Sequence, residues 1–210
     1  MATDDRTTMP VFEPRSKTGQ SHLLRIGATT QMNIYLIRHG KTLANEQHLY
    51  CGSTDLSLSE TGIAELQRLS YDIKNVRFLT SGMKRTNETL KTLFGDVPFE
   101  EDSRLREVDF GLFEMHSYEE LKDREDYQRW ITGNNEENIP PNGESGQQMK
   151  QRVIEAFSEI REDTVLVAHG GVITAIMQHC FPKDEKNRYE WQPKNGCGYL
   201  LSNGTYHPIP

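Results

Sequence analysis

The sequence predicts an α/β fold, a three-layer, doubly wound and mostly parallel sheet with helices on both faces. Short apolar runs at residues 33–37, 76–79 and 164–168 alternate with segments whose apolar residues recur at helical spacing. Each run also leads into a turn that carries glycine together with a cation or an imidazole. Because such strand ends gather along one crevice in open parallel sheets, the fold class also predicts where chemistry should lie.

Four segments have apolar residues at helical spacing. They cover residues 59–73, 89–94, 149–160 and 172–177. Ser59 is a suitable N-cap for the first helix, and Gly95 is placed to end the second. A last strand is expected at 198–201, before a turn at Asn203 and Gly204.

The pattern loosens between residues 103 and 146, where only one helix, at about 117–130, is expected. Long irregular inserts in compact domains are usually functional lids or disordered. The aromatic side chains of Tyr118, Tyr127 and Trp130 favour a lid over residues 110–146.

Composition limits the domain count and the partners. The chain has 210 residues and a net charge of −7, which suits one cytoplasmic domain over 32–210 and disfavours broad binding to nucleic acid. Residues 1–31 are polar and predicted to be a disordered arm or a non-native extension. No apolar run approaches the ~18 residues of a membrane span. Three cysteines without CxxC spacing argue against a disulfide framework and a zinc knuckle.

Four basic or imidazole side chains follow the predicted strands. Arg38 and His39 follow the first, Arg85 the second and His169 the third. If they converge, two guanidinium groups and a charged imidazole would match a phosphate dianion, and the helix start at Gly170 would add backbone donors. Each residue alone suits a structural role better, and no further ligand shows metal-site spacing.

An unprotonated imidazole can attack a phosphoryl group held in this way, which gives a phosphohistidine that water then cleaves. His39 is the candidate nucleophile. The leaving alcohol needs a proton, and Glu107 is the candidate that donates it and later takes one from the attacking water.

Several motifs together resemble the histidine phosphatase superfamily, in the branch that contains cofactor-dependent phosphoglycerate mutase, the fructose bisphosphatase domain and alpha-ribazole phosphatase. They are Arg38-His39-Gly40 with Thr42 and Asn45, the stretch 81–89 around Arg85, Glu107 to Gly111, Gly143-Glu144-Ser145 and His169-Gly170-Gly171. The resemblance implies a phosphoglycerate mutase-like fold, transient phosphorylation of His39 and no metal or cofactor. It also implies that Arg38, Arg85 and His169 bind the phosphate while Glu107 transfers protons. It places Asn45, Thr42, Cys51, Gly52 and Gly170 among the substrate contacts.

Within the superfamily, the stretches 50–56 and 110–115 are similar to the alpha-ribazole phosphatase group. Members of that group remove the 5′-phosphate from the lower-ligand nucleotide of cobalamin. Met115 stands where many other relatives carry glycine. The resemblance therefore implies a phosphomonoester hydrolase whose expected substrate is alpha-ribazole 5′-phosphate, in the assembly of the cobalamin nucleotide loop. A broad-specificity phosphatase, a phosphoglycerate mutase and a non-catalytic phosphate-binding module remain alternatives.

Overall fold

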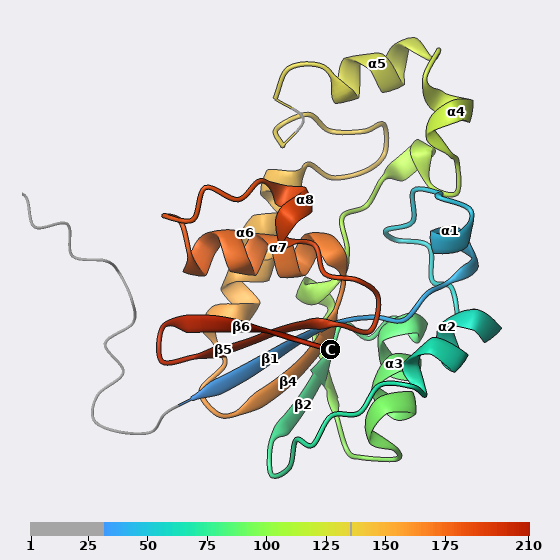
Figure 1. Cartoon of the computed structure of the whole chain (residues 1–210). Helices are drawn as coiled ribbons and strands as arrows, with labels where there is room; N and C mark the ends of the chain where they lie inside the picture. The colour runs from blue at the N-terminus through green and yellow to red at the C-terminus, as the bar shows by residue number, and fades with distance from the viewer. Residues whose placement is uncertain (1–31, 135) are drawn as a thin grey trace, which may run out of the picture.

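A computed structural model of the chain describes residues 32–134 and 136–210, so the prediction for residues 1–31 lies outside the described residues (Figure 1). The strands form one sheet in the order β3-β2-β4-β1-β5-β6. They are β1 Asn33–Arg38, β2 Arg77–Thr80, β3 Glu100–Glu101, β4 Thr164–Ala168, β5 Gly198–Ser202 and β6 Thr205–Ile209. The α-helices are α1 Leu43–Glu46, α2 Glu60–Leu66, α3 Lys84–Phe94, α4 Tyr118–Leu121, α5 Glu125–Ile131, α6 Gly146–Ser158, α7 Gly170–Cys180 and α8 Arg188–Trp191.

The sheet confirms the predicted α/β class and adds an antiparallel edge. Strands β3, β2, β4 and β1 run parallel, whereas β5 and β6 are antiparallel to their neighbours. The sequence predicted β5 but not β6. Asn203 and Gly204 both have positive φ, 51° and 72°, which two-residue hairpin turns of type I′ require. The chain therefore returns as a second strand.

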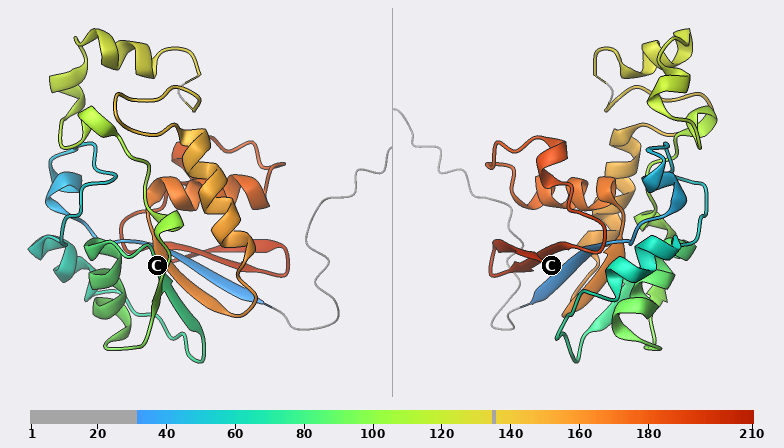
Figure 2. Two further views of the ribbon diagram at one scale, coloured as in Figure 1. Left: turned by 180° about the vertical axis from the view of Figure 1, so that it is seen from behind. Right: turned by 45° about the vertical axis from the view of Figure 1, so that its right-hand side comes forward.

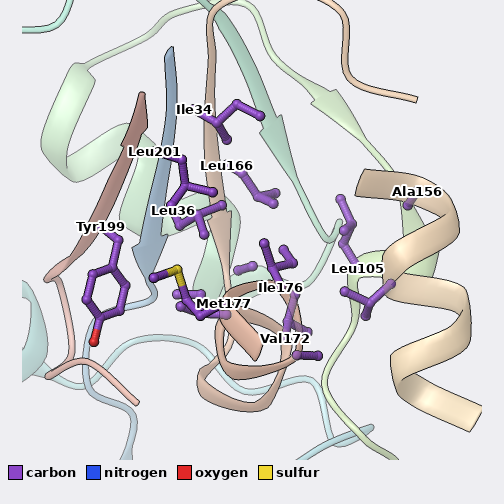
Figure 3. Close-up of a cluster of buried hydrophobic side chains, with 14 of the residues drawn as sticks. Ile34, Leu36, Leu105, Ala156, Leu166, Val172, Ile176, Met177, Tyr199 and Leu201 are labelled. Carbon is purple, nitrogen blue, oxygen red and sulfur yellow. The ribbon is translucent and has the colours of Figure 1, made fainter. Parts of the chain in front are cut away.

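Both faces of the sheet are covered, as a doubly wound fold requires. On one face Leu36 and Leu166 pack under α6 and α7 in the cluster that Figure 3 shows. On the other face Ile37 and Val167 pack with Leu90 of α3. Leu36 and Ile37 are adjacent in sequence and point to opposite faces because strand side chains alternate. Full burial of each such side chain contributes about 1.5–3 kcal/mol.

Two predicted helices differ from the structure. The helix expected over 59–73 ends at Leu66, although Ser59 does cap it by accepting a bond from the Gly62 N–H. The helix expected over 117–130 is two short helices, α4 and α5. Asp126 accepts hydrogen bonds from the Arg124 side chain and from the Tyr127 N–H. These bonds lie in the first turn of α5 and separate it from α4.

Helices α4 and α5 stand away from the sheet, beyond its strand ends (Figures 1 and 2). Leu121 of α4 and Tyr127 of α5 are buried together with Phe113, from the 3₁₀ turn Gly111–Phe113 before them, in a small separate cluster. A single β-bridge, Leu49 to Ser117, ties this part to the segment after α1. It occupies the region predicted as a lid, whose movement stays a prediction. Within residues 32–134 and 136–210, no helix has both the length and the apolar character to cross a membrane.

Candidate active site

The ends of β1 and β4 bring two distant histidines together. Because β1 and β4 are parallel and Arg38 pairs with Ala168, the residues that follow them lie side by side. The His39 N–H donates to the Ala168 carbonyl at 3.0 Å. The ring centroids of His39 and His169 are 5.2 Å apart, at an interplanar angle of 63°. The predicted convergence of the two strand ends is therefore present.

The His39 ring has one nitrogen engaged and one available. Nδ1 lies 2.7 Å from the Gly40 carbonyl oxygen, which can only accept, so Nδ1 carries the hydrogen. The lone pair is then on Nε2. Burial, followed by the positive charges of Arg85 and Arg38, holds the pKa of His39 well below its usual 6.5. A neutral imidazole with a free Nε2 is the form that can attack phosphorus.

The tautomer of His169 follows from its neighbours. Arg85 Nε donates to Nδ1 at 3.3 Å, so Nε2 carries the hydrogen and donates to Ser81 Oγ at 2.8 Å. Burial, then Arg85 and His39, holds the pKa of His169 well below 6.5. The expectation of a charged imidazole is wrong for this structure, because a fully buried ring beside a guanidinium loses its proton.

Arg85 is 1% exposed, and backbone carbonyls hold it. Its Nη1 donates to the Thr54 carbonyl at 2.8 Å and its Nη2 to the Gly52 carbonyl at 2.7 Å. With Nε bonded to His169, three of its five N–H groups are used. The two that remain can bind an anion.

Arg38 ends strand β1 and also has donors to spare. Its Nη1 donates to the Pro193 carbonyl at 2.8 Å. Its Nε is buried and has no hydrogen-bond partner within the described part of the chain. A buried donor without a partner costs free energy, which an anionic ligand in reach of this group would recover.

Glu107 lies against the start of α7. Its Oε2 accepts a bond from the Gly171 N–H at 2.9 Å, and Oε1 accepts one from the Val108 N–H at 3.0 Å. A Cβ at position 171 would lie 2.4 Å from Oε1, so glycine is what lets the carboxyl group come this close. Arg152 holds the same segment, since its Nη2 donates to the Glu107 carbonyl at 3.0 Å.

We call Arg38, His39, Arg85, Glu107 and His169 the cationic cup. The sequence predicted all five, and they adjoin one another. Arg85 bonds His169, whose ring lies beside His39. Arg38 and Glu107 interact electrostatically, and the negative charge of Glu107 partly offsets the lowering of the Arg38 pKa by burial. Two guanidinium groups and a neutral nucleophile thus face one another with a carboxyl group at the side.

The five predicted substrate contacts come from α1, from residues 51–52 and from the start of α7. Thr42 and Asn45 bond each other in the capping box that starts α1, and Thr42 is 1% exposed. The Cys51 thiol is half-buried and points at the Thr54 carbonyl, 3.6 Å away. Gly52 holds Arg85 through its carbonyl, and Gly170 is the first residue of α7. Their direct contact with substrate stays a prediction.

A cavity of about 470 Å³ opens beside Glu107 and Gly171. We call it the aromatic pocket, because its wall includes six aromatic side chains, those of Tyr50, Phe110, Tyr118, Tyr127, Trp130 and Tyr189. The sequence analysis singled out Tyr118, Tyr127 and Trp130 as aromatic residues of a lid, but it missed Tyr50, Phe110 and Tyr189. These residues come from separate segments, so no spacing in the sequence relates them. The pocket can hold an apolar or planar group next to the carboxyl group.

Fold and site define the class of protein. The chain matches the model of the histidine phosphatase superfamily (branch 1) over residues 34–208, and it belongs to that family. The protein is therefore a phosphatase.

Similar proteins narrow the comparison within that family. The adenosylcobalamin/alpha-ribazole phosphatase of Escherichia coli (strain K12) is 30% identical over 178 residues, which cover 79% of this chain and 87% of that protein. The protein of the same name from Salmonella typhimurium is 29% identical over 179 residues, which cover 79% and 88%.

Two solved structures have a similar fold. A candidate alpha-ribazole-5′-P phosphatase from Escherichia coli K-12 matches with a TM-score of 0.74 at 24% identity, over 85% of this chain and 95% of that one. The phosphoglycerate mutase from Thermus thermophilus matches with a TM-score of 0.68 at 24% identity, over 85% and 99%. At 24% identity, both similarities concern the fold alone.

Proposed function

We propose that the protein hydrolyses a phosphomonoester through a phosphohistidine on His39. Nε2 of His39 attacks phosphorus, an N–P bond forms, and the ester P–O bond breaks. Glu107, in its acid form, gives its proton to the leaving oxygen. A water molecule then attacks phosphorus and yields a proton to Glu107, the N–P bond breaks, and inorganic phosphate is released. The reaction uses no metal and no cofactor.

The observation that carries this proposal is the state of His39. The ring is neutral, its Nε2 lone pair is free, and it lies among Arg38, Arg85 and His169. Both guanidinium groups have N–H donors left for the phosphoryl oxygens, where negative charge is spread in the transition state. The Ser81 bond fixes the His169 ring in one orientation.

The substrate we propose is alpha-ribazole 5′-phosphate, a small molecule of cobalamin nucleotide-loop assembly. The aromatic pocket supports it, because a planar heterocycle can pack against the rings of Tyr118 and Trp130 while its phosphate reaches the cup. The names of the relatives at 29% and 30% identity support it as well. We place the protein in the cytoplasm, a reducing compartment that suits the free thiols of Cys51, Cys180 and Cys197.

The variant His39→Ala tests the reaction. We expect kcat to fall by about 10⁴- to 10⁶-fold, as for other covalent nucleophiles, with an unchanged melting temperature to within a few degrees. Wild-type enzyme incubated with ³²P-labelled substrate and quenched in alkaline detergent should carry an alkali-stable, acid-labile label, which the variant lacks. Turnover unaffected by the substitution would remove the nucleophile assignment.

A panel of phosphomonoesters tests the substrate. Alpha-ribazole 5′-phosphate is expected to have the highest kcat/KM among aromatic, sugar and sugar-acid monoesters. A flat profile would favour a broad-specificity phosphatase. Phosphate exchange between sugar acids faster than phosphate release would favour a mutase.

A further inference from the structure

Glu114 lies outside the cationic cup, yet its carboxylate gathers five donors. Oε1 accepts bonds from the N–H groups of Gly52 at 2.9 Å, Ser53 at 3.0 Å and Phe110 at 3.1 Å. Oε2 accepts bonds from the Thr54 N–H at 3.2 Å and from its hydroxyl at 2.7 Å. Four of these donors belong to residues 52–54, which we call the clamp loop.

The clamp loop has a cation on its other side. The Gly52 carbonyl accepts a hydrogen bond from Arg85 Nη2 at 2.7 Å, and the Thr54 carbonyl accepts one from Arg85 Nη1 at 2.8 Å. The loop's N–H groups therefore face a carboxylate while two of its carbonyls face a guanidinium. The carboxylate attracts the N–H ends of the peptide dipoles and the guanidinium attracts their carbonyl ends. Both charges therefore favour the same orientation of the peptide units, and the two sets of bonds strengthen each other.

The clamp loop lies close to the chain that follows Glu107, and the Glu114 carboxylate holds it there. A Cβ at Gly52 would lie 1.6 Å from the Val108 carbonyl oxygen. The backbone of Gly52 is therefore in close contact with the backbone of Val108. If Glu114 could no longer accept, several adjacent N–H groups would lose their partner. The peptide units would then rotate toward water, and the carbonyls would leave Arg85.

We propose that Glu114 is a positioning residue for phosphate transfer, which acts through the clamp loop to fix the Arg85 guanidinium in the cup. The inference rests on the proposed function, in which Arg85 binds the phosphoryl group. It also links two parts of the molecule. Phe110 lines the aromatic pocket, and the residue after Glu114, Met115, donates to the Tyr50 carbonyl at 2.7 Å.

Glu114→Gln is the direct test, because the amide keeps the size of the side chain but replaces an acceptor by a donor that faces N–H groups. With 4-nitrophenyl phosphate we expect kcat/KM to fall about 10- to 100-fold, as for a displacement of a catalytic group by about 1 Å. The inhibition constant of inorganic phosphate should rise by a similar factor. Glu119→Gln is the matched control, since the Glu119 carboxylate is exposed and bonds the Lys122 side chain, and both constants should stay within about twofold of wild type.

A double-mutant cycle separates positioning from general damage. In an Arg85→Ala background, where kcat/KM is already low, Glu114→Gln should change it by less than about twofold. An equal loss in both backgrounds, or a wild-type phosphate inhibition constant in Glu114→Gln, would overturn the proposal. If Glu114→Gln does not fold, Thr54→Val removes one of the five donors and should lower kcat/KM about two- to fivefold, in the wild-type background only. Failure of the proposed function is a different result, namely an Arg85→Ala variant with wild-type turnover.

Discussion

The cationic cup and the aromatic pocket adjoin at Glu107 and Gly171, yet they are built in different ways. The imidazoles and the inner guanidinium of the cup are 0–6% exposed, and backbone or hydroxyl partners fix each of them. The pocket lies between the first turns of α6 and α7 and the short helices α4, α5 and α8. Of these, α4 and α5 stand away from the sheet (Figure 2). Two of its rings are largely exposed, Tyr118 at 52% and Tyr189 at 75%.

The cup and the pocket also differ in the elements that hold them in place. Parallel strands and α3 and α7 hold the cup, whereas loop contacts join the part of the chain that carries the pocket. They include the Leu49–Ser117 bridge, the bonds of Glu114 to the clamp loop, the bond from the Met115 N–H to the Tyr50 carbonyl and an ion pair of 2.7 Å between Glu136 and Arg188. An ion pair with partly exposed partners contributes about 0–1 kcal/mol. In the proposed function, the cup carries out the phosphate transfer and the pocket contacts the leaving group. Substitutions in the two regions should therefore separate kcat from substrate preference.

The largest separation is expected for Glu107→Gln. Loss of the proton donor should lower kcat about 10²- to 10⁴-fold for alkyl phosphates, whose leaving oxygen needs a proton. With 4-nitrophenyl phosphate, whose leaving group is weakly basic, formation of the phosphohistidine should be much less affected. The labelled intermediate should then accumulate, because Glu107 also activates the water. Rapid-quench kinetics measure both steps, and equal losses for the two substrates would contradict the assignment.

The buried imidazoles should also make the cup the acid-sensitive region. The folded-state pKa values of His39 and His169 lie below the unfolded value of about 6.5, so the unfolded chain binds more protons in this range. Stability is therefore full above pH 6.5 and is lost as the pH falls toward the folded pKa values, by at most about 1.4 kcal/mol per pH unit for each ring. Denaturant unfolding between pH 7 and 5 measures the slope. His39→Asn should reduce it by about half, and an unchanged slope would show that other groups dominate.

A smaller and selective effect is expected in the pocket. Tyr118→Ala should raise KM about three- to tenfold for aryl or nucleoside-like phosphomonoesters, because a stacked ring contributes about 1 kcal/mol. For glycerol phosphate, kcat and KM should stay within about twofold of wild type. Ile139→Ala is the matched control, since Ile139 is 55% exposed and does not line the aromatic pocket. An equal change for both substrates would mean that Tyr118 does not contact the leaving group.

The smallest effect concerns the segment that joins the two regions. Met115 has φ = 61°, in the left-handed region where a side chain costs about 1 kcal/mol. Met115→Gly should raise the free energy of unfolding by about 0.5 kcal/mol, since the gain exceeds the added freedom of the unfolded chain. Asn142→Gly is the control. Asn142 has nearly the same φ, 62°, but asparagine tolerates it, so we expect no gain. A loss of stability in Met115→Gly would show that the packing of the methionine outweighs the strain.

The strand ends were the most predictable part of the site. Arg38 and His39 follow one apolar run and His169 follows another, and parallel pairing leaves few other places for them. Glu107 lies in an irregular stretch, so the sequence identified it as a candidate proton donor but did not predict its position beside the Gly171 N–H. The role of Glu114 had no signal in the sequence, because its five donors are backbone N–H groups and a hydroxyl from separate segments.

The predicted helix boundaries are wrong where the local sequence pattern and the tertiary contacts disagree. The apolar spacing continues past Leu66 although α2 ends there, and Ile63 of that helix is exposed. Residues 117–130 have the composition of one helix, but the Arg124–Asp126 contact and the packing of Tyr127 divide it. Side-chain contacts with distant residues outweigh helix propensity in short segments such as these.

The sequence by itself determined the alternation of strands and helices, the residues at the strand ends and hence the chemistry of the cup, because these depend on periodicity and on local chain geometry. Tertiary structure alone decided the neutral state of the two imidazoles, the grouping of six aromatic side chains into one pocket and the carboxylate behind the clamp loop. Burial and the meeting of distant segments produce these features, and both exist only after the chain has folded.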